Sequence, residues 1–303
     1  MVSFLEMVGI YALVIFLYES LRSPASMLCG WIFSDGKPLS VRYGKWAVIT
    51  GPTDGIGKQY ALRLAKKGLN IFLLARSEQK LKRLADEIKT SYGVEVQWMV
   101  TDFTEGWRLY ELIENAIKQL DIGILVNNVG MNVRLPIPFD TLYKEEMEQG
   151  IAVNITSTMM MTHIVLPGMK LRERGLIINV SSGGARVPWA LVNLYGSTKA
   201  FINSFSQALQ EELEGTGVEV QLVIPMFVDT NMIEEHKTRT FHKLFATPVD
   251  RYGKHVAYTI GTTGWTTGYW YHGLQYTLTR VFPLFIAIKI QTMWMRMLIK
   301  PKQ

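Results

Sequence analysis

Apolar residues follow two different spacings along the middle of the chain. Short runs rich in apolar and β-branched residues have strand character: Trp46–Ile49, Asn70–Leu74, Val94–Val100, Ile122–Val126, Leu176–Val180 and Val218–Ile224. Between them, apolar residues recur at helical spacing, for example Ala61, Leu62, Leu64 and Ala65, and then Leu81, Leu84 and Ile88. Buried strands separated by helices indicate βαβ crossovers. The pattern therefore predicts an α/β fold with a doubly wound parallel sheet, of Rossmann type, in a single domain.

The beginning of the chain does not follow this pattern. Residues 2–18 are almost entirely apolar and are interrupted only by Ser3, Glu6 and Gly9. A run of about 17 residues is just long enough to span the hydrocarbon core of a bilayer as a helix. We therefore expect residues 1–20 to form an uncleaved membrane anchor. A helix that lies in the membrane interface, or packs on the domain, is the alternative.

Charges around this run decide its orientation. A cleaved signal peptide needs a positive charge near its start, whereas the first charged residue here is Glu6. Basic residues instead follow the run: Arg22, Lys37, Arg42 and Lys45. The positive-inside rule then leaves the rest of the chain in the cytosol. Residues 21–42 contain Pro24, Gly30, Gly36 and Pro38, and we interpret them as a linker.

The end of the chain differs from the rest in charge. After Asp250 there are seven basic residues and no acidic residue, so residues 1–250 carry −1 of a net charge of +6. Nucleic-acid binding is one interpretation, but this stretch is also rich in Trp and Tyr and strongly apolar, which is typical of a membrane surface. We expect a catalytic domain at 43–245 and a C-terminal extension at 246–303 that is associated with substrate and membrane, with no nucleic-acid partner.

Composition narrows the chemistry. The mean hydropathy of +0.11 is high for a freely soluble enzyme. The only cysteine is Cys29, which excludes an internal disulfide framework and favours a reducing environment. The chain has no CxxC, no HExxH and no clustered His and Cys spacing, so no metal site is expected.

A glycine-rich turn follows the first predicted strand and opens a helix. It reads Thr50-Gly-Pro-Thr-Asp-Gly-Ile-Gly57, in which Gly51 permits a tight turn, Gly55 leaves room for a pyrophosphate and Gly57 allows close helix–strand packing. Helix N-terminal N–H groups attract the phosphate charge. At the start of an α/β repeat, this turn predicts dinucleotide binding, with Thr53, Asp54 and Ile56 beside the cofactor.

The end of the second strand indicates which dinucleotide binds. An NAD enzyme tends to place a carboxylate there for the ribose 2′-hydroxyl, but this chain has Arg76 and Ser77. An arginine can grip a 2′-phosphate with two N–H groups, and the serine hydroxyl can add a bond. We therefore expect NADPH. The alternative is a solvated arginine at the cap of the helix that starts near Ser77.

Three residues predict acid–base chemistry. Tyr195 and Lys199 are four residues apart and share one helix face, where the cation is expected to lower the pKa of the phenol. Ser182 lies 13 residues before Tyr195, just after a strand, where its hydroxyl can bond a substrate oxygen. Ser181 is the competing candidate, and the 13-residue spacing favours Ser182. The set predicts acid–base chemistry at a substrate oxygen.

Together, the TGxxxGIG turn, Asn127-Asn128-Val129-Gly130, Ser182 and Tyr195-x-x-x-Lys199 resemble the short-chain dehydrogenase/reductase family over roughly residues 43–230. Segments 53–57, 122–131 and 166–169 resemble its very-long-chain 3-oxoacyl-CoA reductases, also known as 17β-hydroxysteroid dehydrogenases of types 12 and 3. These are enzymes of the endoplasmic-reticulum membrane.

The resemblance implies roles for matching positions. Tyr195 would be the general acid, Lys199 would lower its pKa and hold the nicotinamide ribose, and Ser182 would polarise the carbonyl. Asn154 would hold a water that links Lys199 to solvent; an ordinary polar helix residue is the alternative. Relatives that have lost the tyrosine are regarded as inactive, whereas this chain keeps Tyr195.

Further roles follow for the cofactor site. Asp102 would contact adenine, with a strand-end cap as the alternative. Asn128 would support the central sheet and the cofactor, and the turn after Pro225 would border the nicotinamide. The family carries its substrate loop where this chain has residues 227–250. Members often pair through the helices that carry Asn154 and Tyr195, so the resemblance also implies a homodimer.

The sequence thus predicts NADPH-dependent reduction of a lipid ketone at the endoplasmic-reticulum membrane, with the catalytic domain in the cytosol. A 3-oxoacyl-CoA, reduced to the 3-hydroxyacyl-CoA in fatty-acid elongation, is the first choice of substrate. A 17-ketosteroid, as in a 17β-hydroxysteroid dehydrogenase, is the alternative. A non-catalytic membrane scaffold that only binds the cofactor is the second alternative.

Overall fold

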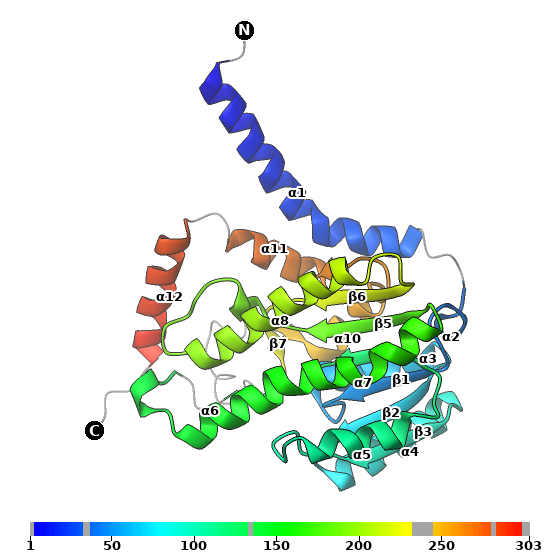
Figure 1. Ribbon diagram of the computed structural model, residues 1–303. Coiled ribbons are helices and arrows are strands. Elements are labelled where there is room, and N and C mark those ends of the chain that lie inside the picture. The colour runs from blue at the N-terminus through cyan, green and yellow to red at the C-terminus, as the bar shows by residue number, and fades with distance from the viewer. Residues whose placement is uncertain (1–2, 33–36, 133–135, 232–244, 280–282, 299–303) are drawn as a thin grey trace.

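A parallel sheet forms the centre of the molecule (Figure 1). The computed structural model describes residues 3–32, 37–132, 136–231, 245–279 and 283–298. Its main sheet has seven parallel strands in the order β3-β2-β1-β4-β5-β6-β9. Their bounds are β1 Trp46–Thr50, β2 Asn70–Ala75, β3 Val96–Val100, β4 Ile122–Asn127, β5 Gly175–Val180, β6 Val218–Val223 and β9 Trp265–Thr266. The predicted doubly wound sheet is confirmed, and the strand order reverses between β1 and β4, which opens a crevice at the carboxyl ends.

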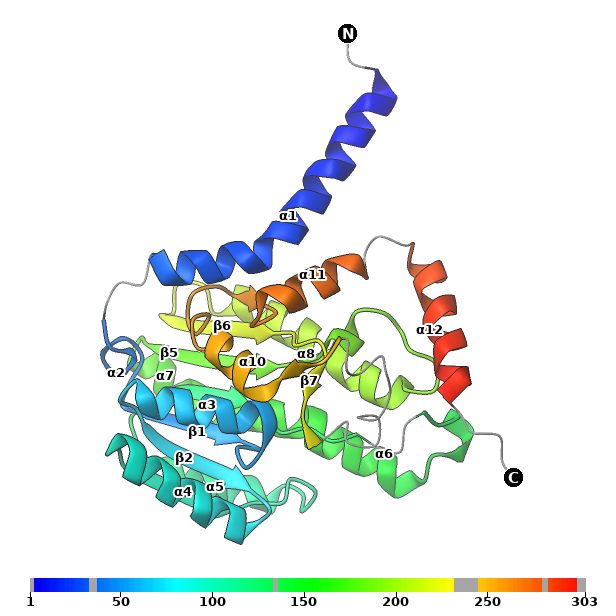
Figure 2. The same ribbon diagram turned by 180° about the vertical axis from the view of Figure 1, so that it is seen from behind.

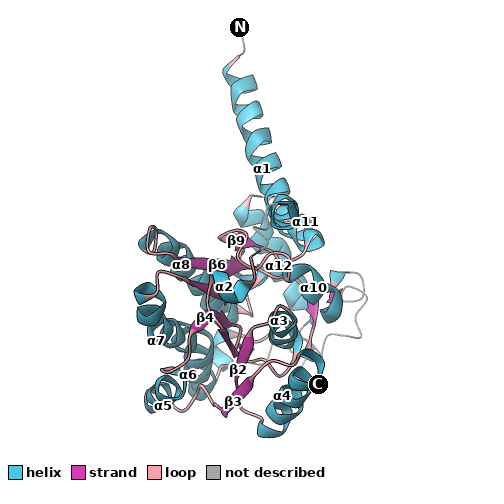
Figure 3. Ribbon diagram, turned by 90° about the vertical axis from the view of Figure 1, so that its right-hand side faces the viewer, coloured by secondary structure: helices cyan, strands magenta, loops and turns pink. Residues whose placement is uncertain are grey.

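Helices cover both faces of this sheet (Figure 3). On one face lie α3 (Gly55–Lys66), α4 (Glu78–Tyr92) and α10 (Val249–Val256), and on the other lie α5 (Arg108–Ile117), α7 (Ser157–Leu171) and α8 (Asn193–Glu212). Every residue of β1, β4 and β5 is buried. Strands covered on both faces are apolar throughout rather than alternating, which is why continuous runs revealed them.

One long helix crosses a face of the sheet. It consists of α6 (Lys144–Ile151), a π-helical turn (Ala152–Thr156) and α7. By length and composition, Lys144–Leu171 is the one helix among the described residues that is long and apolar enough to cross a membrane, but 44% of its apolar window is buried. Because α7 supplies Met161, Val165 and Met169 to the core, we interpret it as a core helix of the domain.

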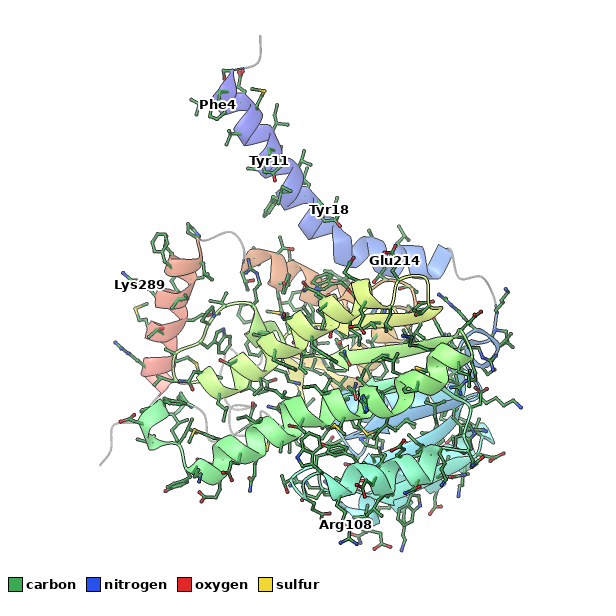
Figure 4. All side chains as sticks on the ribbon, in the orientation of Figure 1. Phe4, Tyr11, Tyr18, Arg108, Glu214 and Lys289 are labelled. Atoms are coloured by element: carbon green, nitrogen blue, oxygen red, sulfur yellow. The ribbon has the colours of Figure 1, made fainter. Side chains whose placement is uncertain are left out.

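Helix α1 extends beyond the predicted anchor. It runs from Phe4 to Ile32 without interruption, so the residues expected to begin a linker at 21 are helical. The segment up to Tyr18 projects from the body with Phe4 and Tyr11 exposed, and the helix then bends to lie along it (Figure 4). Pro24 has no N–H for the carbonyl of Ser20, which weakens a helix without necessarily ending it, and accounts for a bend on its N-terminal side.

The C-terminal residues do not form a separate layer. Strand β9 pairs with β6 through Leu222 and Trp265, so the extension expected from residue 246 supplies the edge of the sheet itself. Helix α11 (Trp270–Leu278) lies beside the second part of α1, and α12 (Leu284–Leu298) follows (Figure 2). A sequence search for apolar runs misses β9 because it is only two residues long.

Short elements complete the chain. They are α2 (Leu39–Arg42), 3-10 helices at Phe139–Thr141 and Gly183–Ala185, and a second small sheet of β7 (Val228–Asp229) and β8 (Thr247–Pro248). In that sheet Val228 pairs with Thr247, which brings together the two ends of the expected substrate loop. Residues 232–244 of that loop lie outside the described residues.

Candidate active site

The glycine-rich turn joins the carboxyl end of β1 to the N-terminus of α3. Asp54 caps the helix by accepting a hydrogen bond from Gly55 N at 2.7 Å. A Cβ at Gly57 would lie 2.2 Å from Gly51 O and 2.3 Å from Asn128 Nδ2. Position 57 therefore has no space for a side chain, which gives the predicted close helix–strand packing a direct physical cause.

Asn128 holds this turn from the end of β4. Its Nδ2 donates to Thr50 O at 3.1 Å and to Gly51 O at 2.9 Å. Thr50 Oγ1 in return accepts from the backbone N–H groups of Asn128 and Val129, both at 3.0 Å. The side chain thus ties β4 to the turn after β1, and this contact is the structural basis for the supporting role expected of Asn128.

The residues expected near adenosine lie at the ends of β2 and β3. Arg76 is exposed directly after β2. Ser77 caps α4 by accepting from Lys80 N at 3.4 Å. Asp102 accepts from the backbone N–H of Thr104 at 3.0 Å and from its hydroxyl at 2.8 Å. Asp102 therefore has the strand-end capping contact considered as its alternative, and the helix cap is supplied by Ser77 rather than by Arg76. The contacts of all three residues with a cofactor stay predictions.

Ser182 and Tyr195 meet beside the carboxyl end of β5. Ser182 precedes the 3-10 helix Gly183–Ala185, and its Oγ accepts from Gly184 N at 3.1 Å. Burial raises the pKa of Tyr195, and a hydrogen bond with the Ser182 side chain opposes that rise. At neutral pH the Tyr195 phenol is therefore protonated and can donate its proton. It lies in contact with the Ser182 hydroxyl, which is expected to bind the carbonyl.

Lys199 is placed differently from expectation. Its ammonium is buried and donates to Val180 O at 3.0 Å, while burial lowers the pKa of Lys199 to about 8. The lowered Tyr195 pKa that the spacing predicts is not found: burial of the phenol raises the pKa, and the hydrogen bond with Ser182 is the opposing effect. Stabilisation of a phenolate by Lys199 stays a prediction. Ser181 donates to Lys199 O at 3.0 Å, so it positions the lysine and leaves Ser182 to the site.

Asn154 lies in the π-helical turn between α6 and α7. Its Oδ1 accepts from Met131 N at 2.8 Å, and its Nδ2 donates to Met131 O at 3.0 Å and to Thr198 Oγ1 at 3.0 Å. A Cβ built on Gly130 would lie 3.4 Å from both Asn154 Oδ1 and Lys199 Nζ. The asparagine therefore lies next to the lysine, while the water between them stays a prediction.

Two residues that the sequence analysis did not select close over the glycine-rich turn. Thr230 Cγ2 would be 2.9 Å from a Cβ at Gly55, and Asn231 Nδ2 donates to the Asp54 carboxylate. They follow β7, just past the carboxyl end of the last core strand, where ligands bind in open α/β sheets. That topological rule was the signal available for finding them.

Pro225 and Met226 lie at the same edge. Gly183 N donates to Pro225 O at 2.8 Å, and a Cβ at Gly183 would lie 2.2 Å from Met226 Sδ. Met226 N in turn donates to Nδ1 of the buried His272 at 3.3 Å. The turn after Pro225 therefore packs directly against the turn that carries Ser182. No group of His, Cys, Asp and Glu side chains that would hold a metal ion occurs among the described residues.

Comparison with known proteins agrees with this geometry. Residues 45–240 match the family described as short chain dehydrogenase. The chain is 40% identical over 249 residues to human inactive hydroxysteroid dehydrogenase-like protein 1, which covers 82% of this chain and 75% of that protein. It is also 40% identical over 265 residues to very-long-chain 3-oxoacyl-CoA reductase-A of Danio rerio, with 86% and 81% covered.

A solved structure is similar as well. The short-chain dehydrogenase from Sphingobium yanoikuyae in complex with NADPH has a TM-score of 0.64 and 30% sequence identity, covering 69% of this chain and 81% of that one. The family match spans more than half of the chain, so the resemblance drawn from the motifs is confirmed. The chain belongs to the short-chain dehydrogenase family.

Proposed function

We propose that this chain reduces a lipid ketone with NADPH, and that the ketone is a 3-oxoacyl-CoA reduced to a 3-hydroxyacyl-CoA in fatty-acid elongation. The observation that carries the proposal is the contact between Ser182 and Tyr195 beside the glycine-rich turn. A protonated phenol and a neutral hydroxyl, side by side at the cofactor edge, suit the delivery of a proton to a carbonyl oxygen.

The residues present fit a dinucleotide. The turn from Gly51 to Gly57 leaves a cradle in which side-chain bulk is excluded, and α3 offers its N-terminal N–H groups to a pyrophosphate. NADPH, when bound, supplies the hydride. Ser182 donates a hydrogen bond to the carbonyl oxygen, Tyr195 gives that oxygen its proton, and Lys199 stabilises the phenolate left behind.

Arg76 supports NADPH over NADH, because an exposed guanidinium at the end of β2 can pair with a 2′-phosphate. Changing Arg76→Ala should weaken NADPH binding by ~1.5–3 kcal/mol, the usual range for a charged hydrogen bond, and leave NADH binding nearly unchanged. Isothermal titration with both cofactors measures this. Equal weakening of the two would remove Arg76 from the 2′-phosphate.

Features of the C-terminal residues support an acyl-CoA. Lys289, Thr292, Met293 and Arg296 of α12 line a hollow of about 560 Å³ that combines positive charge with apolar surface. Phosphates of CoA would be attracted by the two cations, and an acyl chain by the apolar side chains. A relative named very-long-chain 3-oxoacyl-CoA reductase-A points the same way. The same apolar surface suits a ketosteroid, which is the second candidate substrate.

A non-catalytic cofactor-binding scaffold is the rival from another class, and a relative named as inactive favours it. The site itself favours an enzyme, because Ser182 is in contact with Tyr195 and the buried Lys199 ammonium is bonded to Val180 O, at the end of the strand that leads to Ser182. We also infer that the protein resides in the endoplasmic-reticulum membrane through α1 with its catalytic domain in the cytosol, and that it pairs as a homodimer through the helices that carry Asn154 and Tyr195.

The experiment is NADPH oxidation by the full chain in detergent or vesicles, with 3-oxoacyl-CoAs of several lengths and with ketosteroids. Tyr195→Phe should reduce turnover by about 10²–10⁴-fold, the usual contribution of a general acid, while NADPH affinity stays nearly unchanged. The matched control is Tyr258→Phe, at an exposed tyrosine of the extension. A Tyr195→Phe variant as active as the parent would refute the mechanism, and no turnover by the parent would favour the scaffold.

A further inference from the structure

We propose that α11 is a second membrane contact, distinct from the projecting part of α1, and that it holds the described ends of the segment 227–247, at Met226 and at Phe245–Thr247, near the lipid surface. This inference rests on the membrane placement proposed above. It concerns a helix whose two faces have different partners. One face is exposed and apolar, and the other is bonded to both ends of that segment.

The exposed face of α11 is an apolar stripe at helical spacing. Trp270, Leu274 and Leu278 are 50%, 49% and 55% exposed, and their i, i+4, i+8 positions place them on one side. The remaining side is buried, including His272 and Gln275. The helix contains no Asp, Glu, Lys or Arg, so a tryptophan and two leucines face outward without a charged neighbour on the same helix.

The neighbouring helix indicates that lipid covers this stripe. The second part of α1 lies beside α11, and the first part, Phe4–Tyr18, is exposed on all sides (Figure 2). A helix that is apolar on nearly all sides needs apolar surroundings on all of them, and a bilayer provides these for a helix that projects from the body. The stripe on α11 lies next to the point where that helix leaves the body, and a bilayer would cover both.

The charge of the helices that precede and follow α11 in the chain fits the headgroups of an anionic bilayer. Exposed basic residues lie on the helices before and after α11, with Arg251 and Lys254 on α10 and Lys289 and Arg296 on α12. No acidic residue follows Asp250 in the chain. Cations that flank an apolar face with a tryptophan are typical of helices lying in the membrane interface.

The buried face of α11 is bonded to described residues on either side of 232–244. Gln275 Nε2 donates to Phe245 O at 2.9 Å, and His272 Nε2 is 3.0 Å from Thr247 Oγ1. His272 Nδ1 accepts from Met226 N at 3.3 Å. One helix thus bonds the chain on both sides of residues 227–244. With its outer face on lipid, α11 would keep the entrance to the site at the bilayer, where a lipid ketone would arrive.

The test places a nitroxide label on single cysteines of the full chain in vesicles of phosphatidylcholine and phosphatidylserine. Cys29→Ser removes the only native cysteine. Labels replace Leu274 and Leu278 on α11, Leu13 on α1, and Leu112 on α5. Leu112 is 52% exposed on α5, a helix at the opposite end of the molecule from α11, which makes it the matched control (Figure 1).

At positions 274 and 278 we expect dissolved oxygen to relax the label more strongly than a water-soluble nickel complex, and the reverse at 112. Water-like values at 274 and 278 with lipid-like values at 13 would overturn the role of α11 and leave the α1 anchor standing. Water-like values at 13 alone would overturn the anchor and support α11. Protection of 274 and 278 from both reagents, with or without vesicles, would mean that a second copy or another protein covers the stripe, and would overturn the proposal.

Kinetics tests the link to the substrate. The double change Leu274→Glu with Leu278→Glu should raise KM for a vesicle-borne long-chain 3-oxoacyl-CoA by about tenfold, since charge on the stripe opposes burial in lipid, and leave kcat unchanged. KM for a short, water-soluble 3-oxoacyl-CoA should not change, and Leu112→Glu should change neither. Equal KM values for parent and double variant would overturn the entrance role. Absence of turnover in the parent would instead refute the proposed function, while the label measurements would still decide the membrane contact.

Discussion

Among the described residues, the core and the C-terminal extension each bury one basic side chain. Lys199 in the core donates to Val180 O, and burial lowers its pKa to about 8. His272 in the extension is bonded to Met226 N and Thr247 Oγ1, and burial lowers its pKa to about 3. At neutral pH the lysine therefore keeps its charge, whereas the histidine is neutral.

The difference separates catalysis from architecture. A buried cation that is bonded to a neutral carbonyl destabilises the fold, and the core retains it where a phenolate has to be stabilised. A neutral histidine is a rigid connector with one donor and one acceptor. Met226 N lies 3.3 Å from Nδ1 and Thr247 Oγ1 lies 3.0 Å from Nε2, so a neutral ring can accept at one nitrogen and donate at the other. A neutral ring of this kind joins two segments of the chain without burying a charge.

Replacing each of the two buried bases tests whether one serves catalysis and the other serves stability. Lys199→Met should lower kcat by about 10²–10⁴-fold and leave the free energy of unfolding at pH 7 equal or higher. His272→Phe should lower that free energy by about 2 kcal/mol or more, since one unpaired buried donor costs about 1–3 kcal/mol. Urea titration in detergent and NADPH turnover measure the two. A loss of kcat in the His272 variant alone would contradict the catalytic role of Lys199 and the structural role of His272.

Two glycines, Gly57 and Gly253, extend the comparison of core and extension to the packing around them. A Cβ at Gly57 would meet the backbone oxygen of Gly51, whereas one at Gly253 in the extension would meet the end of the Gln59 side chain. Because a backbone cannot move aside cheaply, Gly57→Ala should cost about 1–3 kcal/mol in stability and weaken NADPH binding. Gly253→Ala should cost less, since a side chain rather than backbone has to move, although Gln59 would lose its hydrogen bonds with Asp250 and Arg63. Thermal unfolding with and without NADPH compares them, and equal losses would contradict this account.

The pH dependence of activity tests the charge in the core. Lys199 is protonated below a pKa of about 8, and the raised pKa of Tyr195 keeps the phenol protonated there. The kcat/KM for ketone reduction should therefore fall above pH 8, by up to tenfold per pH unit, as the lysine loses its proton. Lys199→Arg, which keeps its charge, should move the decline to higher pH. An unchanged profile in that variant would assign the decline to another group.

The pH dependence of stability tests the neutral base, with a smaller expected effect. The folded pKa of His272, about 3, lies below its ordinary value near 6.5, so between these limits only the unfolded chain binds the proton. Stability is then fully present above about pH 6.5 and is lost as pH falls, by at most ~1.4 kcal/mol per pH unit. His272→Asn keeps an acceptor for Met226 N and should show a shallower loss between pH 7 and pH 5 in urea titrations. Parallel losses in parent and variant would exclude the histidine as the cause.

The sequence predicts most of the core because its strands are buried on both faces and read as apolar runs. It also places Ser182 and Tyr195, since a fixed spacing from strand to helix brings them together. It misses β9, whose pairing with β6 joins residues 43 positions apart without any periodic signal. It equally misses His272, which contacts Met226 across 46 residues, a distance that only the folded chain closes.

Electrostatics is the part that sequence reasoning handled least well. The spacing of Tyr195 and Lys199 indicated a cation that lowers the phenol pKa, but a pKa depends on burial as well as on neighbours. Burial is a property of the whole fold, and here it raises the pKa of the tyrosine. The end of α1 was missed for a related reason, since helical residues beyond Pro24 lie against α11 and β9.

The bend in α1 has a practical consequence for producing this protein. Removing an N-terminal anchor is the usual route to a water-soluble sample, and a cut at Ile32 would remove the whole helix. That cut would also uncover the surfaces of α11 and β9 on which its second part lies, and leave a sheet edge and apolar side chains free to associate. A start just after Tyr18 would discard only the projecting part and keep that cover in place.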